Sequence, residues 1–106
     1  MYDDAVMCDS LDGLIAAICA DYCRRAEVIE NKSAPYNVLM EYRYLNYRIL
    51  SAAIEVSGSR DAYEFIKDIG SGRGYVKSRL CTLSESVYKR RKKEVKHNIA
   101  KRLSLF

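Results

Sequence analysis

The sequence predicts an all-α domain with a long N-terminal antiparallel helical hairpin, a short third helix and a C-terminal helix-turn-helix. Three observations lead to this prediction. Apolar residues recur at steps of three and four positions, no window alternates apolar and polar residues as a β-strand would, and glycines interrupt the pattern at position 58 and within 70–74. A chain of 106 residues, 49% of them hydrophobic, fits one domain over 1–106. We expect the hairpin over 1–57, and the short helix and helix-turn-helix over 59–106.

The first helix is expected to run from Asp9 to Asn31. Its apolar residues follow helical spacing and therefore share one face: Leu11, Leu14, Ile15, Ile18, Cys19, Tyr22, Ala26 and Ile29. Asp9 or Ser10 supplies the N-cap, and Asp12 lies where the helix dipole favours negative charge. The chain is expected to leave this helix at 31–33.

The second helix is expected over about 34–57, because Ser33 and Pro35 form a helix start. A heptad-like seam runs along it: Val38, Tyr42, Leu45, Ile49, Ala52 and Val56. A second stripe lies off that seam and consists of Met40, Tyr44 and Tyr47. Long helices joined by a short loop pair antiparallel, and a helix with two apolar faces needs two partners. We expect the second stripe to contact either the rest of the domain or, in a homodimer through this helix, another copy of the chain.

A short third helix is expected between two breaks marked by glycine. Gly58 ends the second helix, and Ser59-Arg60-Asp61 starts the third. Its apolar residues are Ala62, Tyr63, Phe65, Ile66 and Ile69. Three glycines within 70–74 then interrupt it, and they do not form a P-loop because no strand precedes them and no Gly-Lys-Ser/Thr ending follows.

The rest of the chain has the layout of a helix-turn-helix. Residues 75–81 have room for two turns of helix, 82–84 form a turn, and a long basic helix runs from Ser84 to about Leu103. Ser84 is the expected N-cap of this helix. Its inward stripe consists of Val87, Tyr88, Val95, Ile99 and Leu103.

Charge is distributed unevenly along the chain. The 18 basic and 14 acidic residues amount to a formal net charge of +4. Residues 1–30 carry two basic and seven acidic residues (net −5), 31–72 carry five of each, and 73–106 carry eleven basic and two acidic residues (net +9). This asymmetry indicates a C-terminal end that binds a polyanion, joined to an end that faces something else.

The basic helix and the segment before it carry the residues expected to bind DNA. In a helix-turn-helix, the first residues of the second helix reach base edges, while Lys and Arg further along neutralise phosphates. The expected base readers are Glu85, Ser86, Lys89 and Arg90. The expected phosphate contacts are Lys92, Lys93, Lys96 and Arg102 on the long helix and Arg73, Lys77 and Arg79 before it. The alternative interpretation is that the run is only the solvated face of a terminal helix.

The stretch 83–95, Leu-Ser-Glu-Ser-Val-Tyr-Lys-Arg-Arg-Lys-Lys-Glu-Val, resembles the recognition helix of phage and prophage transcriptional regulators of the ArpU and RinA type. That helix is in turn similar to the helix-turn-helix of sigma factor region 4, and the resemblance covers about 73–103. It implies binding of double-stranded DNA in a bacterial or phage transcription setting, with RNA polymerase as a further candidate partner. The residues that it places toward the groove are Ser84, Ser86, Lys89 and Arg90.

The remaining residues of the sequence do not indicate a metal site, an enzyme or a membrane protein. The four cysteines Cys8, Cys19, Cys23 and Cys81 lack the paired spacing of zinc sites, and the single histidine, His97, is expected on the surface of the basic helix. We therefore expect no metal and no cofactor. No arrangement of nucleophile and base indicates an enzyme. No window reaches the ~18 apolar residues of a membrane span, and no positively charged signal-peptide region opens the chain, which predicts a cytoplasmic protein without a membrane partner.

Two alternatives to transcription regulation stay open. One is a non-enzymatic helical module whose acidic end binds a protein while the basic helix only improves solubility. The other is a phage DNA-packaging protein of the small terminase kind, which also joins a helix-turn-helix to oligomerising helices. Tyr44, Tyr47 and Tyr75 are further candidates for stacking on single-stranded nucleic acid.

Overall fold

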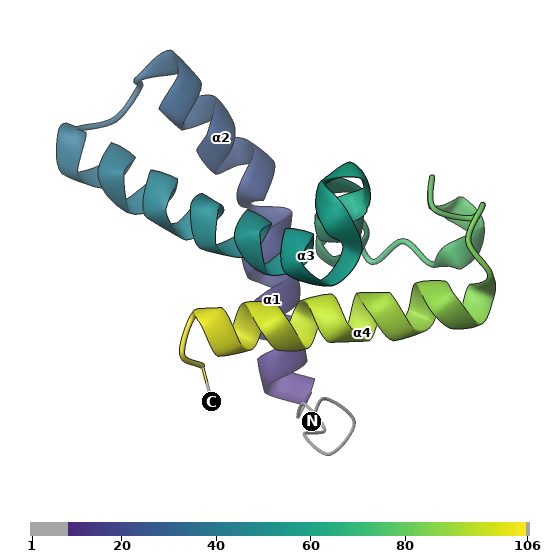
Figure 1. The fold of residues 1–106 in the computed structure, drawn as a ribbon. Helices are drawn as coiled ribbons and strands as arrows, with labels where there is room; N and C mark the ends of the chain where they lie inside the picture. The colour runs from purple at the N-terminus through teal and green to yellow at the C-terminus, as the bar shows by residue number, and fades with distance from the viewer. Residues whose placement is uncertain (1–8, 106) are drawn as a thin grey trace.

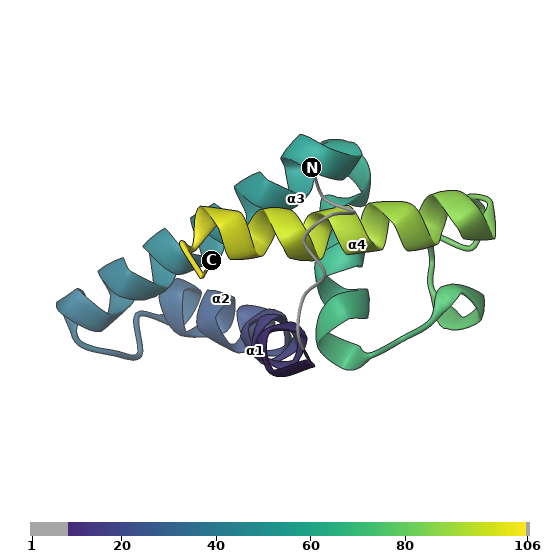
Figure 2. The same ribbon diagram turned by 90° about the horizontal axis from the view of Figure 1, so that it is seen from below.

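A computed structural model describes residues 9–105, and within this range all regular secondary structure is helical, without a strand. The elements are α1 (Asp9–Ala20), α2 (Tyr22–Asn31), α3 (Tyr36–Ser71), a 3₁₀ turn (Tyr75–Lys77) and α4 (Glu85–Arg102). Helix α3 forms the centre, and α1, α2 and α4 all pack against it (Figures 1 and 2). The all-α fold class is thus confirmed. None of the helices in the described range is long and apolar enough to cross a membrane.

The N-terminal helix is bent at Asp21, so the prediction of one regular helix over 9–31 is wrong there. Asp21 has φ −89° and ψ −1°, and α1 ends just before it. The physical reason is the buried Arg25, whose Nη2 donates a 2.7 Å hydrogen bond to the carbonyl oxygen of Ile18. Its Nε donates to Asn46 Oδ1 at 2.7 Å. The bend therefore lets a guanidinium occupy the space between α1, α2 and α3.

Helix α3 consists of two helical stretches that meet at Gly58. Gly58 has φ +81° and ψ 162°, a left-handed backbone conformation that glycine adopts without steric cost. The first stretch lies beside α2 and runs in the opposite direction, and the second stretch turns toward α4 (Figure 1). The break that the sequence predicts at this glycine is present, although helical structure resumes immediately after it.

The core lies where α1 and α4 cross α3. Its largest fully buried apolar side chains are Ile15, Ile49, Phe65, Ile66, Tyr88, Val95 and Ile99. Three residues of the inward stripe predicted for the basic helix, Tyr88, Val95 and Ile99, are among them. Asn98 joins the core through its amide, which donates to the Ala52 carbonyl oxygen at 2.9 Å. His97 is only 9% exposed, so its expected surface position is wrong, and burial lowers its pKa.

The segment between α3 and α4 is a folded loop, and the two-turn helix expected over 75–81 is wrong. Only Tyr75–Lys77 is helical, as a single 3₁₀ turn, and Ser78 is extended with φ −81° and ψ 148°. Side-chain bonds take the place of helical ones. The Tyr75 hydroxyl lies 2.8 Å from the Cys81 carbonyl oxygen, and the Ser78 hydroxyl donates to the buried carboxylate of Asp68. The Ser78 hydroxyl also accepts a 3.0 Å hydrogen bond from the Leu80 amide, and local bonds of this kind compete with backbone helix bonds.

Candidate nucleic-acid interface

The basic helix α4 begins where the sequence predicts. Ser84 is extended, with φ −65° and ψ 151°, and its Oγ accepts a 3.3 Å hydrogen bond from the Val87 amide. This bond satisfies one of the amides that have no partner within the first turn. The Ser84 hydroxyl thus caps the N-terminal end of α4.

The outward face of α4 carries Ser86, Lys89, Arg90 and Lys93, all of them exposed. Their spacing of three, four and seven positions places them on one side of consecutive turns. Lys89 pairs with Glu85 at 2.8 Å, and Arg90 pairs with Glu94 at 3.6 Å. Exposed pairs of this kind contribute only about 0–1 kcal/mol, so a phosphate or a base edge can replace the carboxylates at little cost.

The loop before α4 adds Lys77 and Arg79, which are exposed and form no ion pair with any residue in 9–105. Lys77 and Lys89 line the same hollow of about 430 Å³, together with the backbone of the glycine segment. Figures 1 and 2 both place this loop and the first turns of α4 at the end of the molecule farthest from α2. The two segments therefore present their cations on one projecting surface.

Three of the residues predicted to contact phosphates bind other residues of the protein. Arg73 Nη2 lies 2.8 Å from Asp68 Oδ1, in an ion pair that ties the loop to α3. Lys92 Nζ donates to the Arg73 carbonyl oxygen at 2.7 Å, and burial followed by repulsion from Lys96 lowers the pKa of Lys92. Lys96 pairs with Asp12 of α1 at 3.1 Å. The structure thus uses these cations to connect α1, the loop and α4.

Arg102 also has a partner in another helix, in a pair whose side chains are 40% and 53% exposed. Its Nη2 forms an ion pair with Glu55 of α3 at the far end of α4 from the loop. Together with the pair between Lys96 and Asp12, it shows that part of the positive charge of the C-terminal third is compensated by acidic residues of the other helices. The cationic surface is consequently smaller than the charge count predicts.

The fully buried carboxylate of Asp68 organises the loop, and sequence reasoning missed it. Asp68 Oδ2 accepts hydrogen bonds from the hydroxyls of Ser78 and Tyr88, the latter at 3.1 Å, and its other oxygen faces Arg73. Burial and the adjacent carboxylate raise the pKa of Tyr88 to about 12. One signal was available in the sequence: Asp68 comes three positions after Phe65 and one before Ile69, on the apolar side of the predicted helix, and it needs a polar partner if that side is buried.

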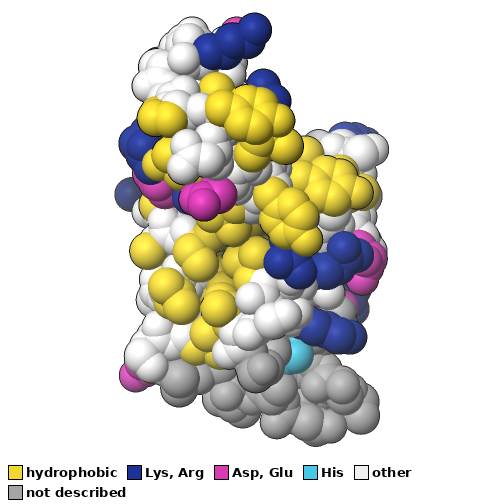
Figure 3. Space-filling view, turned by 90° about the vertical axis from the view of Figure 1, so that its left-hand side faces the viewer, with side chains coloured by type: hydrophobic (Ala, Val, Ile, Leu, Met, Phe, Trp, Pro, Cys, Tyr) yellow, Lys and Arg dark blue, Asp and Glu magenta, His cyan; other side chains and the backbone are white. Residues whose placement is uncertain are grey.

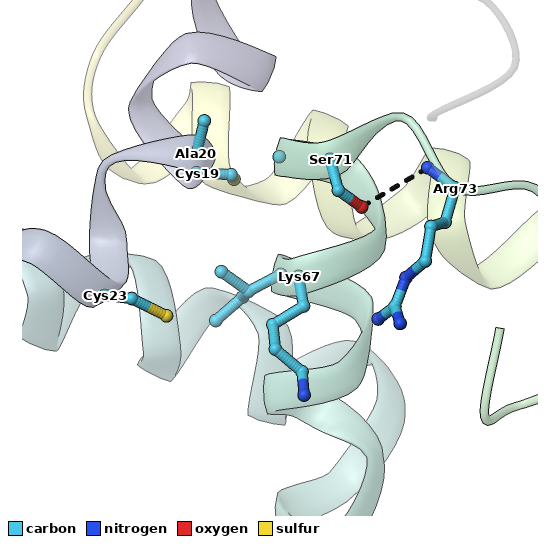
Figure 4. A pocket seen from close by; sticks show the side chains of 8 residues that line it. Cys19, Ala20, Cys23, Lys67, Ser71 and Arg73 are labelled. Atoms are coloured by element: carbon cyan, nitrogen blue, oxygen red, sulfur yellow. Dashed lines mark hydrogen bonds between the residues drawn. The ribbon is translucent and has the colours of Figure 1, made fainter.

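A second hollow, of about 330 Å³, lies between the α1–α2 bend and the end of α3 (Figure 4). Cys23 borders it and shares a 3.1 Å hydrogen bond with the Tyr63 hydroxyl. Cys19 borders it as well, but its thiol is buried and desolvation raises its pKa to about 12. Within 9–105, no three His, Cys, Asp or Glu side chains gather closely enough to hold a metal ion. Cys8 lies outside the described residues.

Alkylation of the native protein should distinguish these cysteines. At pH 8 we expect iodoacetamide to modify Cys23 and Cys81, which are exposed, and to spare Cys19 until the chain is unfolded. The thiolate is the nucleophile, and a thiol with a pKa of about 12 supplies very little of it at that pH. Peptide mass spectrometry on a Cys8→Ser background measures each site. Modification of Cys19 as fast as Cys81 would contradict the buried position of its thiol.

Comparisons with known proteins add no relative: no protein-family model, no curated protein and no solved structure matches this chain. The resemblance of residues 83–95 to phage regulators therefore stays a prediction.

Proposed function

We propose that this protein binds duplex DNA through the outward face of α4 and the loop that precedes it. One observation carries the proposal: Ser86, Lys89, Arg90 and Lys93 form a continuous exposed face at a projecting end of the molecule. The cations of the adjoining loop extend this face. The B-DNA major groove is about 12 Å wide and admits one α-helix.

The side chains of this face suit two kinds of contact. Arg90 and Lys89 can donate to the O6 and N7 acceptors of guanine, and the Ser86 hydroxyl can donate or accept. Lys93 lies one turn further along α4, where it would meet a phosphate. Lys77 and Arg79 would neutralise phosphates on the flank of the groove. The bound state would thus combine base readout by the first turns of α4 with phosphate contacts around it.

In this proposal, α4 is the second helix of a helix-turn-helix, and the stretch of α3 after Gly58 takes the place of the first. The connection is the loop folded around Asp68, which is longer than the three-residue turn that the sequence predicts. By resemblance, the setting would be transcription regulation of a phage or prophage type, with RNA polymerase as a further partner.

The test is a titration of a fluorescent duplex of mixed sequence at about 50 and 200 mM salt. We expect binding to weaken steeply with salt, because each phosphate contact contributes a slope of about −0.9 to the log–log plot. Lys89→Ala/Arg90→Ala should lower the affinity about 10- to 100-fold at the lower salt and flatten the slope by about 1 to 2.

A matched control removes one lysine and one arginine elsewhere. Arg60→Ala/Lys101→Ala changes the net charge equally, but Arg60 follows the bend of α3 and Lys101 lies in the last turn of α4. This control should lower the affinity less than threefold. The proposal is refuted if the protein does not bind duplex DNA at the lower salt, or if both double variants weaken binding equally.

A further inference from the structure

The first half of α3 carries an exposed apolar stripe that no helix of the described chain covers. Tyr36 is 75% exposed, Tyr44 61% and Tyr47 70%. Met40 lies between Tyr36 and Tyr44, and Ile54 continues the row beyond Tyr47; both are exposed as well. Their spacing places all five on one side of the helix. Figure 3 views the side from which α2 and the start of α3 project, and it shows hydrophobic side chains gathered there with Lys and Arg beside them.

The composition of this stripe is that of a protein–protein interface. Tyrosine, methionine and arginine are enriched at such interfaces, whereas lysine is depleted. Arg43 lies within the row, and the Arg48 guanidinium lies 5.1 Å from the centre of the Tyr44 ring at its margin. No lysine occurs between Tyr36 and Ile54. The basic face of α4, which we propose for DNA, has the opposite character.

We propose that a second copy of the chain covers this stripe, with the two α3 helices antiparallel and the two-fold axis near residue 45. In a two-fold interface the same surface meets itself, so positions equally far from the axis on either side face each other. The stripe is chemically complementary in this register. The facing pairs are Tyr36 with Ile54, Met40 with Leu50, and Arg43 with Tyr47 of the second copy.

The charges on one flank of α3 and a hollow on its other flank also fit this antiparallel register. Glu41 and Arg48 lie on the same flank of α3, and each would face the other in the second copy, which forms two ion pairs at the margin. On the opposite flank, a hollow of about 300 Å³ is lined by residues of α2 and by Arg43, Tyr47 and Leu50. In this register Met40 and Tyr47 of the second copy face that hollow.

The exposed area of the stripe is large enough for a protein–protein interface of standard size. A tyrosine buries about 150–250 Å² when fully covered, so three tyrosines exposed by 61–75% supply roughly half of the ~800 Å² that each partner contributes to a standard interface. Met40, Leu50, Ile54 and the two arginines supply the remainder. The surfaces for the second copy and for DNA lie on different helices, so the dimer does not depend on the proposed DNA binding.

The experiment is light scattering coupled to size-exclusion chromatography, without DNA, over a range of protein concentrations. We expect the wild type to have twice the mass of the chain and Tyr47→Asp to have the mass of one chain. Val76→Asp is the matched control, because Val76 is an exposed apolar residue outside the stripe, and it should stay dimeric. Far-UV circular dichroism confirms that each variant is folded.

Charge reversal tests the register. Glu41→Arg alone and Arg48→Glu alone each place like charges opposite one another and should raise the dimer dissociation constant at least tenfold. The double variant restores the ion pairs and should return to within threefold of wild type. A monomeric wild type at the highest concentration, a Tyr47→Asp dimer, loss of the dimer in Val76→Asp, or a double variant no better than the singles would overturn the proposal. Capture of single-stranded DNA by a monomer through Tyr47 would overturn it as well and would assign the stripe to base stacking.

Discussion

Gly70→Ala is expected to lower the free energy of unfolding by about 3 kcal/mol, although alanine favours a helix more than glycine does. Gly70 lies where the end of α3 crosses the end of α1. A Cβ atom at this position would meet the backbone nitrogen and Cα of Ala20 at 2.6 and 2.7 Å, and the carbonyl carbon of Cys19 at 2.8 Å. These are backbone atoms, so no side chain can rotate away, and the two helices must separate.

Gly13→Ala is the matched control, because it makes the same substitution inside a helix but in open space. Apart from the backbone of its own helix and its chain neighbours, no atom of residues 9–105 lies within 4 Å of a Cβ at Gly13. This variant should therefore raise the free energy of unfolding by about 0.5–1 kcal/mol through helix propensity alone. Urea unfolding followed by circular dichroism measures both variants. Equal stabilities for Gly70→Ala and Gly13→Ala would show that α1 and α3 do not cross as closely as described.

Asp68→Ala is expected to lower the free energy of unfolding by about 3 kcal/mol, since it leaves buried donors without their acceptor. The hydroxyls of Ser78 and Tyr88 both donate to this carboxylate, and Arg73 forms its ion pair with it. Because these partners belong to the loop and to α4, the loss of local stability should be largest in those two segments. Amide hydrogen exchange should rise most over 75–83 and at the start of α4.

Asp61→Ala serves as the control for this substitution. Asp61 lies about two helical turns before Asp68 in the same stretch of α3 and is partly exposed. Among the described residues, the ion pair that its carboxylate forms is a 3.7 Å pair with the almost fully exposed Arg60. Asp61→Ala should lower the free energy of unfolding by less than about 1 kcal/mol. Asp68→Ala should also weaken the proposed duplex binding, because the loop that carries Lys77 and Arg79 would lose its fixed position. Unchanged exchange in the loop would refute the role of Asp68 as its anchor.

The elements that the sequence predicts correctly depend on local signals. The start of α4 follows from the capping serine, its buried residues Tyr88, Val95 and Ile99 follow from helical spacing, and the turn in α3 follows from Gly58. Each of these signals lies within a few residues of the structure it specifies. The outward face that we propose for DNA follows by the same periodicity, because the residues opposite the inward stripe are exposed.

The features that sequence analysis missed depend on contacts between distant positions. The bend at Asp21 accommodates Arg25, whose partner Asn46 lies 21 positions away. The loop before α4 is held by Asp68, and the Tyr88 hydroxyl reaches it across 20 positions. A lysine in a basic run looks the same in the sequence whether it points outward, as Lys93 does, or donates inward, as Lys92 does.

The sequence by itself thus determined that the chain is helical, where its last helix starts and which side of that helix is buried, because helix propensity, capping and amphipathic periodicity act over one or two turns. Only the tertiary structure decided which cations remain available. Arg73, Lys92, Lys96 and Arg102 bind oxygen atoms supplied by the loop and by other helices. Which cations bind oxygen atoms of distant segments is decided by how those segments pack, and no local sequence pattern specifies that packing.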